Sequence, residues 1–200
     1  YEWKESFVKS FDETDSRRAA TFLEYYQDAE LTKFGSSMLK LKGHVADGSR
    51  HFDNDIIKMR YSDVLLMMAE VQNGLGKDCA SYINAVRERA YGSAWGAEYA
   101  YTATDFTENE YAILFEKNKE FVQEGQRWWD LRRMQETKGG KHFVFCERAA
   151  METNDGLTYP VLKESEAHKV LWPLDKAMLD KDPSLKQNKG YADPAKCVEW

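Results

Sequence analysis

The apolar positions in the middle of the chain recur at helical spacing and predict three consecutive helices. In the first, Tyr61, Leu65 and Met68 mark one apolar face, and Gly74 and Gly76 end the pattern. This spacing predicts a helix that begins near residue 61 and ends in a glycine-rich turn.

Two further helices follow the same logic. Asp78 is the expected N-cap of the second helix, in which Ile83 and Val86 repeat at i+3 and which ends before Gly92. Thr107–Glu110 has the form of a capping box and starts the third helix. The packed face of that helix runs toward a glycine bend through Tyr111, Leu114, Phe115, Asn118 and Phe121. Helix pairs joined by short turns are what helical repeat proteins stack, although no strict repeat pattern is present.

The segments before these helices have weaker periodicity. Residues 1–35 mix aromatic, charged and short polar runs and predict loop and short helix. Met38–Lys42 alternates and predicts a short strand. Gly43–Asn54 is rich in turn-forming residues and predicts an exposed loop.

Beyond the helices the pattern is irregular. Phe143–Phe145 predicts a brief strand, residues 149–168 show no period, and Asp175 is placed to cap a short helix through Leu179. We therefore expect a mainly α fold with long loops and minor short strands. It divides into a loop-rich lead-in (1–54), a helical core (55–135) and an irregular C-terminal segment (136–200).

Composition narrows the class of protein. The 200 residues are 42% hydrophobic and 14% aromatic, which is enough to bury a core at about the size of one domain. The net charge of -6 argues against a general nucleic-acid binder, which needs surplus Lys and Arg. No apolar run approaches the roughly 20 residues that cross a bilayer.

The three cysteines, Cys79, Cys146 and Cys197, are odd in number and widely spaced, which favours neither a disulfide framework nor a zinc site. Cys79 is expected to pack inside a helix pair.

Three motifs occur in a fixed order along the chain. Arg60–Glu70 has the pattern R-Y-x-D-V-L-L-x-x-A-E, and Glu120–Arg132 has E-x-x-x-E-G-x-R-W-x-D-L-R, with Gly125 as a built-in bend. Leu171–Leu174 and Asp182–Tyr191 are similar to P-I-P and N-P-x-L-x-Q-N-P-G-Y, with departures at Asp182 and Lys189. Together they closely resemble the SusD/RagB family of outer-membrane nutrient-binding lipoproteins.

The resemblance carries several expectations. It implies that the chain is the C-terminal portion of a single SusD-like domain, with tetratricopeptide-like helix pairs largely upstream and a lipid-bearing cysteine outside this sequence. It implies a non-catalytic, surface-exposed protein of the outer membrane that captures oligosaccharides or other nutrients without a cofactor. Its partner would be a TonB-dependent, SusC-like transporter.

The segment Tyr91–Tyr101 places four aromatic rings among small residues in a predicted loop. Aromatic faces stack on the C–H faces of sugars, so this loop is a candidate glycan platform. Trp95 is the leading candidate residue, followed by Tyr99 and Tyr101, and Tyr91 is a further candidate. The alternative is that the rings fold inward and pin the loop to the helices. In the Gly43–Asn54 loop, Asp53 and Asn54 are candidates for contacts to sugar hydroxyls, against the alternative of an ordinary solvated loop.

The acidic triplet Glu116, Glu120 and Glu124 lies on one helical face, as a glycosidase would require. Carboxylates four apart on a helix are, however, usually solvated or paired with arginine, and Arg127, Lys117 and Lys119 are near in sequence. Neither a metal-binding histidine pair nor a nucleophile elbow is present. The sequence thus predicts no catalytic residue and no metal ligand.

Two further expectations concern structure and function. Asp15-Ser16-Arg17, similar to a D-P-R element of the family, is expected to form a structural ion pair. The alternative function is a tetratricopeptide-like scaffold that binds a protein or peptide.

Overall fold

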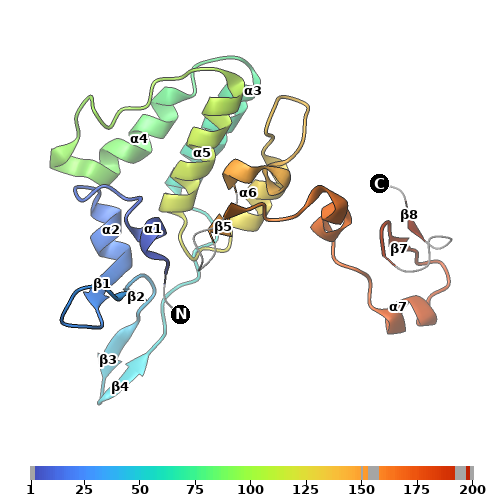
Figure 1. Cartoon of the computed structure of the whole chain (residues 1–200), viewed down its shortest axis with the longest axis horizontal. Helices are drawn as coiled ribbons and strands as arrows, with labels where there is room; N and C mark the ends of the chain where they lie inside the picture. Colours follow the sequence, from blue (N-terminus) through green and yellow to red (C-terminus); the bar gives the residue numbers. More distant parts are fainter. Residues whose placement is uncertain (1–2, 150, 153–157, 192–196, 199–200) are drawn as a thin grey trace. The chain divides into compact units, whose positions relative to one another are not determined.

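A computed structural model describes residues 3–149, 151–152, 158–191 and 197–198. The chain divides into two compact units, Tyr1–Arg127 and Trp128–Trp200, and each is described by itself. Helices outweigh strands in both units, and the strands form only short two-stranded sheets (Figure 1). The mainly α fold is therefore confirmed.

The first unit opens with two short helices and two hairpins. Its elements are α1 (Glu5–Val8), α2 (Ser16–Thr21), β1 (Phe22–Tyr26), β2 (Phe34–Met38), β3 (His44–Ala46) and β4 (Ser49–His51). Strands β1 and β2 are antiparallel, with Phe22 opposite Met38 and Tyr25 opposite Gly35. A Cβ atom on Gly35 would come within 2.4 Å of the Tyr25 ring, so a larger residue at this position would displace that ring.

The structure corrects three local predictions in this region. The predicted strand at Met38–Lys42 lies earlier, over β2, where Ser36 is buried and the sequence lacks the β-branched residues that mark strands. The hairpin β1–β2 was not expected within residues 1–35. The predicted Gly43–Asn54 loop contains the hairpin β3–β4, whose turn at Asp47 and Gly48 has the two positive φ angles of a type I′ turn.

Three longer helices follow: α3 (Tyr61–Gly74), α4 (Ala80–Tyr91) and α5 (Phe106–Glu120), with the 3₁₀ turn η1 (Gly92–Ala94) after α4. All three predicted helices are confirmed. Asp78 accepts a hydrogen bond from the Ala80 amide at 2.9 Å, as its capping role predicted. The cap of α5 is different from the prediction: Asp105, not Thr107, accepts from the Glu108 amide at 3.0 Å, so the helix begins two residues earlier.

Helix α3 packs against both α4 and α5 through apolar side chains and through buried polar contacts, such as Asn73 with Asn109. The side chains without solvent exposure in these helices include Leu66, Ala69, Ile83, Ile113 and Leu114. Cys79 is also fully buried beside them, as predicted. A second cluster, with Val8, Phe11, Phe22 and Val122 at its centre, joins α1 and β1 to the end of α5.

The predicted bend after α5 is confirmed. The helix ends at Glu120, and both Gln123 (φ +63°) and Gly125 (φ +78°) adopt left-handed backbone conformations before α6 (Arg127–Arg133) begins. Glycine reaches this conformation without steric cost, which explains its place between the two helices.

The second unit consists of short elements. After α6 come η2 (Phe143–Phe145), η3 (Glu147–Ala149), β5 (Met151–Glu152), β6 (Thr158–Tyr159), η4 (Glu164–Val170), α7 (Lys176–Lys181), β7 (Gln187–Asn188) and β8 (Cys197–Val198). The strand predicted at Phe143–Phe145 was wrong: Phe143 and Val144 are both fully buried, so their side chains do not alternate between two faces, and the backbone forms a 3₁₀ turn. Asp175 caps α7 by accepting from the Ala177 amide at 3.0 Å, as predicted.

Candidate ligand-binding site

A buried ion network fixes the helices around the candidate site. Arg17 of α2 donates through Nη2 to Asp15 at 2.7 Å and through Nη1 to Glu116 at 2.7 Å and Glu120 at 3.1 Å. The predicted structural ion pair at Asp15 and Arg17 is thereby confirmed. It also extends to two carboxylates about a hundred residues away in sequence, on α5.

The same carboxylates bind further arginines. Arg60 and Arg89 both donate to Glu120, and Arg87 donates from Nε to Glu116 at 2.8 Å. Arg60 and Lys40 also reach Glu124. The prediction that basic side chains pair with the acidic triplet is confirmed, but the partners come from other elements.

Two of the basic residues named from the sequence have other partners. Lys117 forms an ion pair with Glu70, and Arg127 donates to the carbonyl of Leu114 at 3.3 Å. The ion pair of Lys117 thus joins α5 to α3, a contact that spacing along one helix did not predict.

The network determines the charge state of Glu120. Burial by itself raises the pKa of this carboxyl, but the hydrogen bond and charge of Arg60, together with Arg89 and Arg17, lower it to about 2. A glycosidase acid needs the opposite shift, toward a carboxyl that is protonated near neutral pH. Glu120 is instead a structural anion that is ionised at neutral pH.

The aromatic loop is built onto the end of α4. Gly92 turns the chain with a positive φ of +53°, η1 follows, and the chain returns so that Tyr99 stacks on Tyr91 with ring centroids 4.1 Å apart. Trp95 lies beside the pair, 6.3 Å from Tyr91. These three half-buried rings form one group, which we call the aromatic cluster (Tyr91, Trp95 and Tyr99).

The cluster is held in place by polar contacts from two directions. The Thr14 hydroxyl donates to the Tyr99 hydroxyl at 3.1 Å, and Arg87 donates to the Tyr99 carbonyl at 3.0 Å. Ser16 donates to the Ala90 carbonyl at 2.6 Å, which ties α2 to the end of α4. Because Arg87 also binds Glu116, the loop is connected to the ion network.

Tyr101 lies apart from the aromatic cluster and pins the loop. Its amide donates to Asn84 Oδ1 at 2.7 Å, its hydroxyl donates to Asn109 Oδ1 at 2.8 Å, and Arg87 lies over its ring. Burial raises the pKa of the Tyr101 phenol. These contacts match the inward-folded alternative for this ring, while a ligand-binding role for it stays a prediction.

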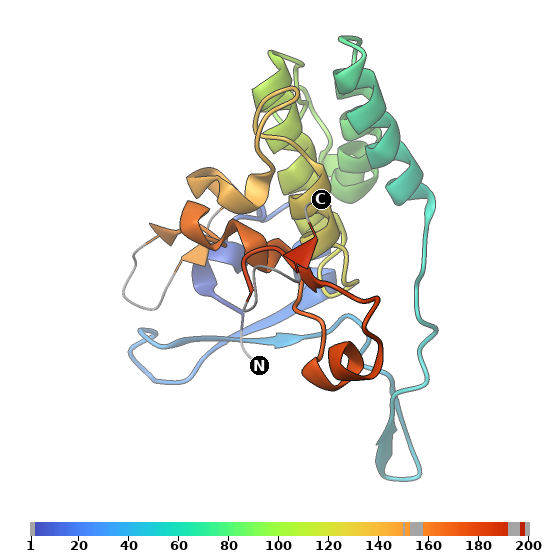
Figure 2. The ribbon, with the colours of Figure 1, turned by 90° about the vertical axis from the view of Figure 1, so that its right-hand side faces the viewer.

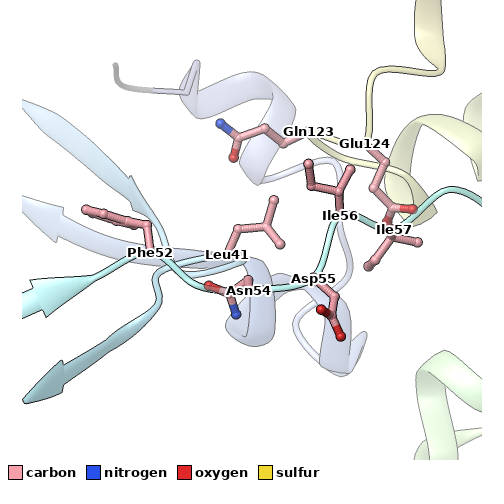
Figure 3. Close-up of a pocket in the computed structure, with 8 residues that line it drawn as sticks. All are labelled: Leu41, Phe52, Asn54, Asp55, Ile56, Ile57, Gln123 and Glu124. Atoms are coloured by element: carbon pink, nitrogen blue, oxygen red, sulfur yellow. The ribbon is translucent and has the colours of Figure 1, made fainter.

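The predicted residues Asp53 and Asn54 belong to another place. Asn54 lines a cavity of about 210 Å³ between the β4–α3 segment and the turn after α5 (Figure 3). The cavity is lined by Leu41, Phe52, Asn54, Asp55, Ile56, Ile57, Gln123 and Glu124. Asp53 faces His44 instead, with Oδ1 3.0 Å from Nδ1, and both side chains are exposed. The six candidate residues therefore lie at four places: the aromatic cluster, Tyr101 beside Asn109, Asn54 in the cavity and Asp53 beside His44.

A larger cavity of about 400 Å³ lies between the first turns of α3 and the later turns of α4. The sequence analysis did not predict this cavity. Its lining consists of Arg60, Tyr61, Ser62, Leu65, Ala85, Val86 and Arg89. This volume is in the range of small-molecule sites. The arginines at its rim already bind Glu120, so the cavity borders the ion network.

Within the described residues, no group of three or more His, Cys, Asp or Glu side chains is arranged to hold a metal ion. The same part of the chain contains no helix that is long and apolar enough to cross a bilayer.

Comparison with known proteins identifies the family. The model of the SusD family matches residues 38–191, which include all three sequence motifs. This chain belongs to the SusD family. The resemblance inferred from the motifs is thus confirmed.

Individual SusD-family proteins agree with this assignment. SusD-like protein P38 of Formosa agariphila is 31% identical over 70% of this chain and 25% of its own length. A SusD superfamily protein of Bacteroides fragilis is 47% identical, with a TM-score of 0.84, over 96% of this chain and 40% of its own. The chain therefore spans between a quarter and two fifths of the length of these relatives.

A more distant structure shares the SusD fold. Surface glycan-binding protein A of Bacteroides thetaiotaomicron, solved in complex with laminarihexaose, has a TM-score of 0.56 and 23% identity, and the match covers 92% of this chain and 40% of that one. At this identity the likeness concerns the fold alone.

Proposed function

We propose that this chain is part of a non-catalytic surface protein that binds oligosaccharides, with the aromatic cluster as a stacking platform. The observation that carries the proposal is the stacked pair Tyr91 and Tyr99 with Trp95 beside it, at the end of α4. Sugar rings present apolar C–H faces that pack on such rings, and the polar edges of tyrosine and tryptophan suit their hydroxyls.

The surroundings of the cluster support this role, because they fix the rings before any ligand arrives. Tyr99 is held by Thr14 and Arg87, and α4 is tied to α2 through Ser16. A preorganised site loses less conformational entropy on binding than a mobile loop does. Membership in a family whose fold is also found in a glycan-binding protein agrees with the proposal.

The cellular role follows from the family resemblance. We place the full-length protein at the outer-membrane surface, held by a lipid anchor outside this chain, where it delivers glycan to a TonB-dependent, SusC-like transporter. In this role the chain binds and releases ligand and performs no chemistry. The engagement of Glu116, Glu120 and Glu124 by arginines supports the non-catalytic part of the proposal.

The test is ligand binding by the full-length protein, since the chain spans only part of its relatives' length. Affinity gel electrophoresis against a panel of polysaccharides and host glycans should show retardation that Trp95→Ala abolishes. Isothermal titration with the matching oligosaccharide should show a loss of about 1–3 kcal/mol, by analogy with bases stacked on aromatic rings. The matched control is Trp172→Ala, which removes an indole that is 82% exposed in the second unit.

Retardation that survives Trp95→Ala, Tyr91→Ala and Tyr99→Ala would place the glycan elsewhere and contradict the stacking platform. Failure of every glycan to retard the wild-type protein would contradict the carbohydrate ligand.

A further inference from the structure

Two exposed carboxylates flank the aromatic cluster and lie outside the ion network. The first belongs to Glu98, in the turn Gly96–Tyr99, which is closed by a hydrogen bond of 3.1 Å from the Tyr99 amide to the Gly96 carbonyl. The Glu98 carboxylate folds back over this turn, since a Cβ atom on Gly96 would lie 2.3 Å from its Oε2 and 2.9 Å from its Oε1. Gly96 directly follows Trp95, so the charge of Glu98 lies at the edge of the cluster.

The second carboxylate belongs to Asp12 and reaches the cluster through Thr14. Asp12 Oδ1 accepts from the Thr14 amide at 2.9 Å and from the Thr14 hydroxyl at 2.7 Å, and that hydroxyl also contacts the Tyr99 hydroxyl at 3.1 Å. The two bonds from Thr14 lower the pKa of Asp12, so this carboxyl is ionised at neutral pH. The pKa of the Tyr91 phenol is raised, first by burial and then by the charges of Asp15 and Asp12. The rings thus lie in acidic surroundings.

The cations of the same region are already engaged. Arg17 donates to three carboxylates, and Arg87 donates to a carboxylate of α5 and to a carbonyl of the aromatic loop. Lys119 is half-buried, and its Nζ lies over the Phe11 ring, 5.3 Å from the ring centroid. By contrast, the Glu98 carboxylate has no hydrogen-bond or ion-pair partner within the described residues. Its two oxygens are therefore available to a ligand.

We propose that the aromatic cluster selects neutral glycans, with Glu98 as the residue that determines this specificity. The inference rests on the proposed function, since it concerns the ligand of the same cluster. An ionised carboxylate beside a stacking ring accepts hydrogen bonds from neighbouring sugar hydroxyls, because it has two acceptor oxygens and no proton to donate. A uronate or sulfate group in the same position cannot donate either and carries a like charge, so it is repelled.

The first test compares matched ligands on the full-length protein. Each neutral polysaccharide of the affinity-gel panel is run beside the same polymer oxidised at C6 to the uronate. The wild-type protein should bind the neutral form at least about fivefold more tightly, since two like charges a few ångströms apart in water change a binding constant by about this factor. Added salt should reduce this preference, because exposed charges are screened.

The second test assigns the preference to one residue. Glu98→Gln keeps the shape of the side chain and removes its charge, so the preference for the neutral form should fall to about twofold or less. Glu98→Lys should reverse it. The matched control is Glu30→Gln, which makes the same change of net charge at an exposed position between β1 and β2. Figure 2 shows this hairpin, in blue, extending below the helices of the first unit. The control should keep the wild-type preference.

The outcomes separate this inference from the proposed function. Equal or tighter binding of the oxidised polymers by the wild-type protein would overturn the selection of neutral glycans and leave the stacking platform standing. An undiminished preference in Glu98→Gln, or an equal loss in Glu30→Gln, would overturn the role of Glu98. Failure of every polymer, neutral or oxidised, to bind would contradict the glycan platform itself and the inference with it.

Discussion

Glu120 shows how much of this molecule depends on single buried charges. Its carboxylate is almost completely buried and accepts from Arg17, Arg60 and Arg89, which lie on or before three different helices. Removing one partner of a buried ion pair leaves the others without compensation, which is far more costly than losing an exposed pair. The residue is therefore a structural centre of the first unit.

This gives a prediction for Glu120→Gln in the full-length protein. We expect the free energy of unfolding to fall by about 3–5 kcal/mol, because three guanidinium groups lose a shared anion. Urea denaturation followed by circular dichroism measures the change. Glu98→Gln, which neutralises an exposed carboxylate, should change the stability by less than about 0.5 kcal/mol. Equal effects of the two substitutions would show that the network contributes little.

At this scale the sequence predicted that acidic side chains would be paired but not with which cations. Arg60 and Arg89 are 60 and 31 residues from Glu120, and nothing in local spacing connects them. The pair Asp15 and Arg17 was predictable, because the two residues are neighbours and one caps the helix that contains the other.

At the scale of elements, the bend between α5 and α6 contains two left-handed residues, Gln123 and Gly125. Gly125 has a φ of +78°, and a Cβ atom added there would meet no other atom within 4 Å. Gly74, at the end of α3, is equally open but has no positive φ. The two glycines thus separate the effect of backbone conformation from that of packing.

We predict opposite effects for the two alanine substitutions. Gly125→Ala should destabilise the protein by about 1–2 kcal/mol, since an L-residue is disfavoured in the left-handed region. Gly74→Ala should stabilise it by about 0.4–1 kcal/mol, because it restricts the unfolded chain at no steric cost. Thermal unfolding of both variants measures the difference. Destabilisation by both variants alike would refute the conformational explanation.

The long helices were predictable and the short strands were not, for one physical reason. Fourteen-residue α3 repeats its apolar spacing over several turns, so the pattern is unambiguous. Strands β3 and β4 have three residues each and exposed side chains, so no alternation between core and solvent marks them. The turn at Asp47 and Gly48 was the one available signal for that hairpin.

At the scale of the whole molecule, the network makes stability depend on pH. The pKa of Glu120 falls from 4.5 to about 2 on folding, and that of Glu124 is also lowered: burial alone raises it, but Arg60 and Lys40 outweigh burial. A lowered folded-state pKa means that the stabilisation is complete above the unfolded value and is lost as pH falls through the folded one.

We therefore expect the free energy of unfolding to decrease as pH falls from about 4.5 to about 2, by an amount of the order of 3 kcal/mol from Glu120. Urea titrations at successive pH values measure this slope. The slope should be clearly smaller in Glu120→Gln, which has no carboxyl to protonate at that position. An unchanged slope in that variant would assign the acid sensitivity to other groups.

The candidate site was partly predictable at this scale. The aromatic loop was visible in the sequence because its rings lie among small residues, but the separation of Tyr101 from the aromatic cluster depends on Asn84 and Asn109, which belong to α4 and α5. The 400 Å³ cavity forms between two helices, so no single stretch of the sequence predicts it.

The long sequence separation between Arg17 and its partners on α5 has a consequence for the order of folding during synthesis. Its partners Glu116 and Glu120 lie 99 and 103 residues later, so α2 emerges long before two of the three carboxylates that bind its guanidinium group exist. At ordinary translation rates the wait is about 5–20 s. During that interval the arginine has to stay in water, and the segment around α2 cannot adopt its buried position. The N-terminal part of the first unit should therefore be among the last to acquire its native packing, although it is the first to be made.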